Sequence, residues 1–303
     1  MPSDSGLIFE IERFATFDGP GIRTVVFMSS CPLCCAWCAN PESRDPKRRL
    51  MYWKNRCAGC LRCAASCPAE ALTAGSGGIT IDYRRCDCCG VCAEGCNAQA
   101  LTLAGELMTA GEVMERVSRD SVFYEQTGGG VTFSGGEPFA RFDFLFSLVT
   151  EARNRGFHIC VETTSCAPKE QIARLSPFIN IFLYDIKCID DAKHIKWTGV
   201  SNKLILENYR YLAGNGAGIT VRMPLIPSIN DGEDDLKQAR DFFLELSPRT
   251  RIDLLPYHRL GVTKYERLGL AYPLTGLEPP GAESIRRIKT FFEEAGFTTT
   301  IGG

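Results

Sequence analysis

The cysteines constrain this chain more than any other feature. It has 303 residues and sixteen cysteines, and thirteen of these lie between Cys31 and Cys96. Disulfide scaffolds belong mainly to short secreted chains, whereas this chain is long and of ordinary composition, 45% hydrophobic and 23% charged. Only three histidines are present, so the chain has few histidine ligands for mixed cysteine–histidine zinc sites. The concentration of thiols therefore predicts that the chain binds metal ions or iron–sulfur clusters.

Eight of the cysteines form an internal repeat. Residues 57–73 and 86–102 share the spacing C-x2-C-x2-C-x3-C, with an offset of 29 residues, and both copies end in Ala-Leu-Thr. Bacterial ferredoxins use this spacing, and in two-cluster ferredoxins the fourth cysteine of each run binds the other cluster. We therefore predict a ferredoxin-like α+β insert over residues 51–105 with two 4Fe–4S clusters. The first cluster is assigned to Cys57, Cys60, Cys63 and Cys96, and the second to Cys86, Cys89, Cys92 and Cys67.

Alternatives remain open for the insert. Two zinc sites would also use these thiols, but zinc loops rarely place three ligands two residues apart. Bound clusters would relay electrons from an external ferredoxin or flavodoxin, or would only stabilise a small domain that lacks a large core. The second run contains an additional cysteine, Cys88, which we interpret as a non-ligand, and has Asn97 where the first run has Pro68.

Outside the insert, strand-like segments alternate with helical ones, which predicts an α/β fold with a parallel sheet. About six such units indicate a partial, TIM-like (β/α)6 barrel formed by residues 1–50 and 106–303. Active residues of such a barrel are expected on loops at the carboxyl ends of its strands. Several of the expected strands are near-continuous apolar runs. They cover residues 23–28, 131–134, 158–163, 179–186, 219–224 and 251–256.

Three helices have clear sequence signals. A capping box from Thr109 to Glu112 precedes an apolar stripe. A second stripe runs through residues 142–152. The last helix carries Ile285, Ile288 and Phe292 and is expected to end at Gly296.

Charge and hydropathy exclude several classes of protein. The formal net charge is −2, so no broad positive field attracts nucleic acid or an anionic membrane. No apolar run is long enough to span a bilayer, and residues 1–12 lack the pattern of a signal peptide. We therefore expect a cytoplasmic protein without nucleic-acid or membrane partners.

A separate three-cysteine motif follows the first expected strand of the barrel. Cys31, Cys35 and Cys38 have the spacing C-x3-C-x2-C. Three thiolates can hold three irons of a 4Fe–4S cluster and leave the fourth iron open, and a catalytic metal site needs such an open position. The alternative is a structural zinc loop with Cys34 as fourth ligand, but adjacent Cys34 and Cys35 would chelate one tetrahedral ion poorly.

The motif resembles a known cluster loop. The segment CPLCCAWCANPES, residues 31–43, is similar to that of the glycyl-radical-enzyme activating enzymes, a radical S-adenosylmethionine (SAM) family. Residues 18–24, DGPGIRT, resemble the opening motif of that family, and the resemblance covers nearly the whole chain. It implies that the open iron binds SAM. The reduced cluster then cleaves SAM to methionine and a 5′-deoxyadenosyl radical, which abstracts hydrogen from a glycine Cα of a partner enzyme. With the insert, three 4Fe–4S clusters are expected.

The same resemblance implies a SAM pocket. Gly135, Gly136 and Glu137 match the motif that binds the SAM amino group, although this sequence alone favours a tight turn. In the family, the positions of Glu162, Thr163, Asp185 and Lys187 line the SAM carboxylate and, in some members, a monovalent cation; the alternative is a solvated salt bridge.

Arg222 lies in an apolar strand and needs a partner, which the SAM carboxylate would supply. His258 matches a histidine near the ribose. The chain departs from the family at Ser165 and Cys166.

The predicted function is activation of a glycyl radical enzyme, which requires no general acid or base. A second hypothesis keeps SAM cleavage but makes a small molecule or peptide the direct substrate. A third makes the chain an electron-transfer protein with the barrel as scaffold. The third is disfavoured because electron transfer alone needs neither a three-cysteine site nor the Gly135–Pro138 motif.

Overall fold

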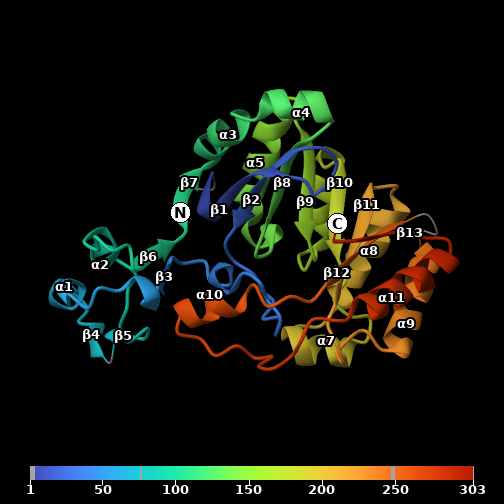
Figure 1. The fold of residues 1–303 in the computed structure, drawn as a ribbon. Coiled ribbons are helices and arrows are strands. Elements are labelled where there is room, and N and C mark those ends of the chain that lie inside the picture. The colour runs from blue at the N-terminus through green and yellow to red at the C-terminus, as the bar shows by residue number, and fades with distance from the viewer. Residues whose placement is uncertain (1–3, 76, 247–249, 303) are drawn as a thin grey trace.

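A computed structural model describes residues 4–75, 77–246 and 250–302. Its main element is a nine-stranded sheet in the order β13-β12-β11-β10-β9-β8-β2-β1-β7 (Figure 1). The six expected strands form its parallel core, which confirms the α/β prediction. They are β2 (Arg23–Met28), β8 (Gly130–Gly135), β9 (His158–Thr163), β10 (Ile181–Asp185), β11 (Ile219–Leu225) and β12 (Arg251–Pro256).

Three further strands extend this core. The antiparallel strands β1 (Ser5–Ala15) and β7 (Glu106–Thr109) continue the sheet beyond β2, and β13 (Thr298–Ile301) pairs in parallel with β12 at the other edge. The strand order does not close on itself, so the sheet is curved and open. These three strands, of which β7 and β13 are the edges of the sheet, are not among those predicted from the sequence.

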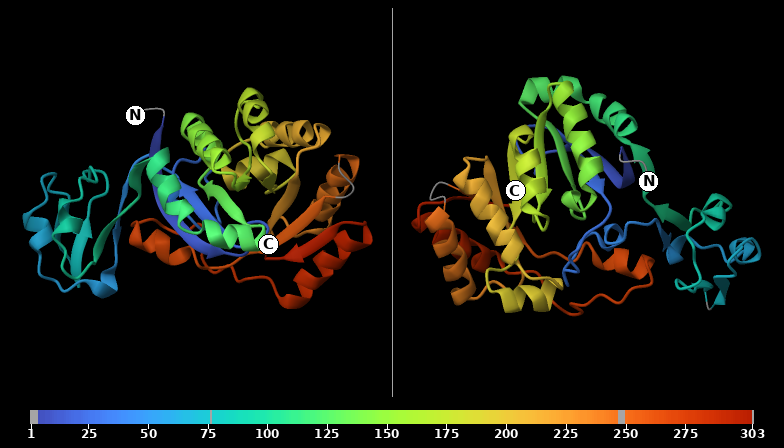
Figure 2. Two further views of the ribbon diagram at one scale, coloured as in Figure 1. Left: turned by 90° about the horizontal axis from the view of Figure 1, so that it is seen from above. Right: turned by 180° about the vertical axis from the view of Figure 1, so that it is seen from behind.

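Helices pack on the outer side of the curved sheet (Figure 2). At the start of α3, the Thr109 hydroxyl accepts from the Glu112 amide at 3.3 Å and the Glu112 carboxylate accepts from the Thr109 amide at 2.8 Å, which confirms the capping box. The barrel helices are α3 (Ala110–Ser118), α4 (Ser121–Thr127), α5 (Phe142–Asn154), α6 (Lys169–Leu175), α7 (Asp191–Thr198), α8 (Lys203–Gly214), α9 (Glu233–Leu246), α10 (Val262–Arg267) and α11 (Ala282–Glu294). None of the helices described could cross a membrane.

The cysteine-rich segment projects from one side of the barrel (Figure 1). A two-stranded ribbon, β3 (Arg49–Tyr52) with β6 (Leu101–Ala104), leads into and out of it. Its other elements are β4 (Leu72–Gly75), β5 (Gly78–Ile81) and two single-turn helices, α1 (Arg62–Ala65) and α2 (Val91–Glu94). A small apolar cluster, separate from the main core, forms its centre, with Leu50, Leu72, Ile79, Cys92 and Leu101 as its buried members.

Helix α10 joins this segment to the barrel. The Arg267 guanidinium lies over the Trp53 ring, 3.4 Å from the ring centroid, and the Tyr83 hydroxyl donates to the Arg267 carbonyl at 3.0 Å. On its other side, the Lys264 ammonium contacts Glu42, next to the C-x3-C-x2-C motif, at 2.7 Å. One helix therefore contacts both the insert and the loop that carries the first three cysteines.

Candidate active site

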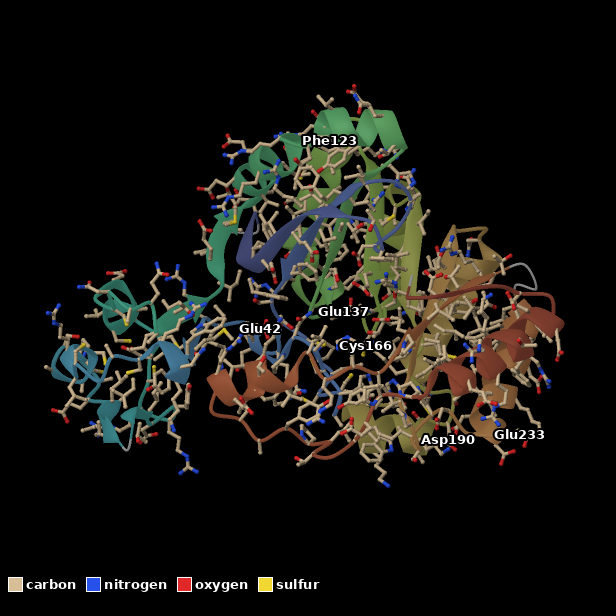
Figure 3. The ribbon with its side chains drawn as sticks, viewed as in Figure 1. Glu42, Phe123, Glu137, Cys166, Asp190 and Glu233 are labelled. Atoms are coloured by element: carbon tan, nitrogen blue, oxygen red, sulfur yellow. The ribbon has the colours of Figure 1, made fainter. Side chains whose placement is uncertain are left out.

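A cavity of about 240 Å³ lies at the carboxyl ends of the barrel strands. Glu137 and Cys166 mark this end in Figure 3, and Phe123 marks the opposite end. The cavity brings together nine of the predicted site residues: Cys31, Cys35, Cys38, Gly135, Gly136, Glu162, Asp185, Lys187 and His258. Three others, Glu137, Thr163 and Arg222, lie outside its lining. The sequence analysis did not single out Ser134 and Thr164, which also line it.

The backbone of the first cysteine motif is held from two sides. The Cys34 and Ala36 amides donate to the last carbonyls of α7, those of Thr198 and Trp197, at 2.7 and 2.9 Å. From the other side, the Arg44 guanidinium donates to the Cys35 carbonyl at 2.7 Å. The backbone of the loop is thereby held by backbone and guanidinium contacts on both sides.

The chemistry of these thiols fits an iron–sulfur cluster. Cys35 is buried and Cys31 and Cys38 are half-buried, whereas Cys34 is exposed and does not line the cavity. Burial raises the pKa of Cys31, and it raises that of Cys35 to about 12, although the charge of Lys187 acts in the opposite direction. Buried thiols of this kind become thiolates when a cation binds and displaces their protons. Three such ligands suit a cluster with one open iron.

Glycine at the end of β8 allows this strand to approach neighbouring backbone closely. Gly135 has φ +120°, and a Cβ there would lie 2.3 Å from both the amide nitrogen and the carbonyl oxygen of Met28. At Gly136 a Cβ would lie 2.3 Å from the Ser30 carbonyl. Only glycine therefore fits between β8 and the cysteine loop, and both residues present bare backbone to the cavity.

We predict that Gly135→Ala destabilises the protein by about 2 kcal/mol or more, because it adds a backbone clash to an unfavourable φ. We also expect SAM affinity to fall, because the β8 end must move. The midpoint of urea unfolding and SAM binding by equilibrium dialysis measure these effects. Gly111→Ala is the matched control: nothing lies within 4 Å of a Cβ built at Gly111 in α3, and stability should change by less than about 1 kcal/mol. Equal behaviour of the two variants would contradict the prediction.

Glu137 is 1% exposed and its carboxylate is saturated by protein donors. One oxygen accepts from the Phe139 amide and the Thr163 hydroxyl, and the other from the amide and hydroxyl of Thr164. Burial raises its pKa, and the bonds from Thr163 and Thr164 offset part of the rise. A carboxylate has about four lone-pair sites, so a contact with the SAM ammonium group would require one of these bonds to break. The bonds tie the glycine turn to the end of β9.

Asp185 and Lys187 form a half-buried ion pair on the cavity wall, with 3.0 Å between the Lys187 Nζ and a carboxylate oxygen. Burial alone would lower the pKa of Lys187, but the charges of Asp185 and Cys35 outweigh it, and the pKa is raised. Burial raises the pKa of Asp185, and Lys187 opposes that rise. The cavity therefore contains a permanent ammonium charge close to Cys35.

Arg222, 4% exposed, is enclosed by acceptors of the protein itself. It contacts the carboxylates of Glu162 and Asp18 and the carbonyl of Phe17, and the Asp18 contact is 3.3 Å long. Burial favours a higher pKa for Glu162, but the charge of Arg222 and a hydrogen bond from Ser134 outweigh it, so the pKa is lowered. Arg222 thus fixes Glu162, which does line the cavity, and links it to the DGPGIRT loop.

Two histidines flank this region. His258 is exposed, lines the cavity and accepts from the Leu260 amide at 3.3 Å. His194 is buried, and its Nδ1 lies 2.7 Å from the Val200 carbonyl and 3.0 Å from the Thr198 hydroxyl. The sequence analysis gave His194 no role. Its contacts shape the end of α7 that holds the cysteine loop, and only the three-dimensional arrangement reveals this.

The eight cysteines of the repeat line two cavities in the insert. One, of about 300 Å³, is lined by Cys57, Cys60, Cys63 and Cys96. The other, of about 10 Å³, is lined by Cys67, Cys86, Cys89 and Cys92, together with Cys88. The repeat also shows in the hydrogen bonds: the Ala71 amide donates to the Cys67 sulfur and the Ala100 amide to the Cys96 sulfur, both at 3.3 Å.

Across residues 4–75, 77–246 and 250–302, no three His, Cys, Asp or Glu side chains converge closely enough to hold one metal ion. A 4Fe–4S cluster makes a different demand, because each thiolate binds its own iron. The two cavities show which cysteines of the repeat lie together.

Known proteins resemble this chain over most of its length. Residues 83–242 match the radical SAM superfamily. A trans-4-hydroxy-L-proline dehydratase activating enzyme of Clostridioides difficile is 39% identical over 300 residues, 98% of this chain and 99% of that protein. An isethionate sulfite-lyase activating enzyme of Nitratidesulfovibrio vulgaris is 44% identical over 292 residues, 94% of each.

Among solved structures, a domain of a pyruvate-formate lyase-activating enzyme from Bacteroides vulgatus has a TM-score of 0.50 and 32% sequence identity. The match covers 58% of this chain and 100% of that one. A radical SAM methyltransferase from Sphaerobacter thermophilus, 15% identical with a TM-score of 0.53, shares the fold over 92% of this chain. With similarity to activating enzymes over nearly its whole length, the chain belongs to the radical SAM superfamily and, within it, to the activating enzymes of glycyl radical enzymes.

Proposed function

We propose that this activating enzyme binds three 4Fe–4S clusters and that Cys31, Cys35 and Cys38 hold the reactive one. The observation that carries the proposal is the 240 Å³ cavity, in which these thiols face the glycine turn of β8 and the Asp185–Lys187 pair. When bound there and reduced, the cluster supplies the electron that cleaves SAM into methionine and the 5′-deoxyadenosyl radical. The residues of the chain bind and orient SAM and exclude water from the cavity.

The cavity wall offers a complementary partner to each charged group of the amino-acid part of SAM. Lys187 keeps its proton because its pKa is raised, so it can attract the SAM carboxylate. Glu162 stays ionised because its pKa is lowered, so it can attract the ammonium group. Gly135 and Gly136 let the ligand lie against the backbone, and His258 at the rim is assigned to the ribose. We assign Glu137, Thr163 and Arg222 to holding this wall in place.

The oxygen atoms of Glu162, Thr163 and Asp185 are also candidate ligands for a monovalent cation. Each of these side chains already has a protein partner: Arg222 for Glu162, Glu137 for Thr163, and Lys187 for Asp185. A cation here would therefore replace existing contacts. We therefore assign the cavity to SAM, and a cation would bind there only together with SAM.

For the insert we propose one cluster on Cys57, Cys60, Cys63 and Cys96 and one on Cys67, Cys86, Cys89 and Cys92. The separation of the cysteines into two cavities supports this exchange of the fourth ligand between the runs. Helix α10 touches both the insert and the loop of the reactive site. We therefore favour electron relay over a purely structural role for these clusters.

The protein substrate is a partner enzyme with a glycine that becomes the radical. The test is anaerobic incubation of the reduced holoenzyme with SAM and a candidate partner. We expect a glycine-centred doublet in electron paramagnetic resonance and one 5′-deoxyadenosine for each radical formed. Turnover of a small molecule in the absence of any partner would instead support direct action on a metabolite and overturn the proposal.

A further inference from the structure

The surface around the first cysteine run of the insert is positively charged. Lys54, Arg56 and Arg62 are exposed there, and residues 51–69 contain no Asp or Glu. Within the part of the chain that the structure describes, none of these three cations has a carboxylate oxygen within 4.0 Å. No carboxylate therefore neutralises these charges locally, and their positive potential extends into the solvent.

The second cysteine run carries charges of both signs, although it is built on the same repeat. Residues 82–97 contain Asp82, Asp87 and Glu94 against Arg84 and Arg85. Arg85 is also paired with Glu70 at 3.1 Å. The positive field is consequently confined to the face of the first run, which we call the Lys54–Arg62 face and define as the exposed residues Lys54, Arg56, Cys60, Leu61 and Arg62.

Helix α10 fixes part of this face. Arg56 lies 4.1 Å from the Trp53 ring centroid, and Arg267 of α10 lies 3.4 Å from the same centroid. Burial lowers the pKa of Arg267, and the charge of Arg56 lowers it further. Two like charges are thus held on one indole ring, and the charges of Glu266 and Glu42 offset part of the fall in the pKa of Arg267.

The same face gives access to the thiols. Cys60 is exposed, Leu61 is 39% exposed, and both line the 300 Å³ cavity together with Arg62. A small apolar contact beside a redox centre, surrounded by charges of one sign, matches transient electron-transfer interfaces, which are small and depend on electrostatic attraction for speed.

We propose that a small acidic electron-carrier protein docks on the Lys54–Arg62 face and delivers its electron to the cluster of Cys57, Cys60, Cys63 and Cys96. One electron leaves the carrier, which is oxidised, and enters this cluster, which is reduced. The inference rests on the proposed function, because it assumes clusters in the insert that relay electrons. The chain itself has a net charge of −2, so the attraction is a property of this face and not of the whole molecule.

The test compares two charge-reversed holoenzymes with the wild type. In the first, Lys54→Glu and Arg62→Glu reverse the face while Arg56 keeps its contact with Trp53. In the matched control, Lys47→Glu and Arg84→Glu make the same change in net charge at exposed positions outside it. Cluster reduction is followed by visible absorbance in an anaerobic stopped-flow instrument. The reductants are an acidic flavodoxin in its hydroquinone form and, separately, photoreduced deazaflavin.

We expect the face reversal to lower the second-order rate constant for flavodoxin by about tenfold or more at low salt. The control should stay within about twofold of the wild type, since its charges lie outside the docking face. The difference should shrink as salt is added, because exposed charges are screened. Reduction by deazaflavin should be the same in all three proteins.

Equal rates with flavodoxin for the wild type and the face reversal would overturn the docking site. Normal SAM cleavage with deazaflavin in the same samples would then leave the proposed function standing, so the two failures are distinguishable. If the reversal lowers the iron content, Lys54→Gln with Arg62→Gln provides the second variant. Slower reduction by flavodoxin at full iron content supports the docking site, and an unchanged rate overturns it.

Discussion

Replacing Cys38 with alanine is expected to abolish SAM cleavage and glycyl radical formation while about two thirds of the bound iron remains. The reason is that, in the proposed assignment, Cys38 binds one of three separate irons at the reactive site, whereas the insert has its own eight ligands. Production of 5′-deoxyadenosine, which should fall below detection, measures SAM cleavage, and electron paramagnetic resonance measures the glycyl radical. Iron analysis of the reconstituted protein measures the iron that remains.

Cys34→Ala is the matched control, because Cys34 is exposed, adjacent to Cys35, and does not line the cavity. It should keep full iron content and activity. If Cys34→Ala lost the cluster and Cys38→Ala kept it, the ligand assignment would be wrong, and Cys34 would have to replace Cys38 as a ligand.

Arg222→Met is expected to cause the largest loss of stability among single substitutions in the barrel. Arg222 is 4% exposed and contacts two carboxylates, so its removal leaves Glu162 and Asp18 close together without their shared cation. Breaking a buried ion pair from one side costs about 3–5 kcal/mol. The shift in the midpoint of urea unfolding under anaerobic conditions measures the loss.

The pH dependence of this loss separates electrostatics from packing. In the wild type, Arg222 lowers the pKa of Glu162, so the stability from this contact is present above the ordinary carboxyl range and is lost as pH falls through the lowered pKa. In Arg222→Met the two carboxylates repel each other, and their pKa values should rise. The deficit of the variant should therefore shrink from about pH 8 to about pH 6.

Arg259→Met is the control, because the Arg259–Glu278 pair is 2.8 Å long but its side chains are 50% and 72% exposed. It should cost no more than about 1 kcal/mol. A deficit of Arg222→Met that does not change with pH would show that the loss comes from packing and not from the unpaired carboxylates.

The strands of the barrel were predictable because their signals are local. Strands covered on both faces are continuous apolar runs, and β2, β9 and β12 begin and end at the expected residues. The capping box of α3 is likewise contained in four adjacent residues. By contrast, β7 and β13 are the two edge strands and β1 lies next to β7, and their places in the sheet depend on pairing with segments that are distant in sequence.

Nine of the predicted site residues line one cavity, but their contacts were not predictable from the sequence. Spacing and resemblance located Cys31, the glycine turn and Lys187, and these do share one cavity. The donors around Glu137 come from the end of β9, the residue after it and the turn itself, and the acceptors around Arg222 come from β9 and the loop after β1. Such partners are far apart in sequence, so a buried charge indicates that a partner is needed but not which residue supplies it.

Transfer of deuterium tests the central claim most directly. A partner enzyme carrying deuterium at the Cα of its glycines is incubated anaerobically with the reduced holoenzyme and unlabelled SAM. If this chain abstracts hydrogen from the glycine of its partner, the 5′-deoxyadenosine formed must contain one deuterium. An equal amount of glycyl radical must appear, as a narrow signal, because deuterium replaces the Cα hydrogen that splits the doublet. Unlabelled 5′-deoxyadenosine formed in amounts equal to the radical, or label arriving only from an added small molecule, would contradict the account.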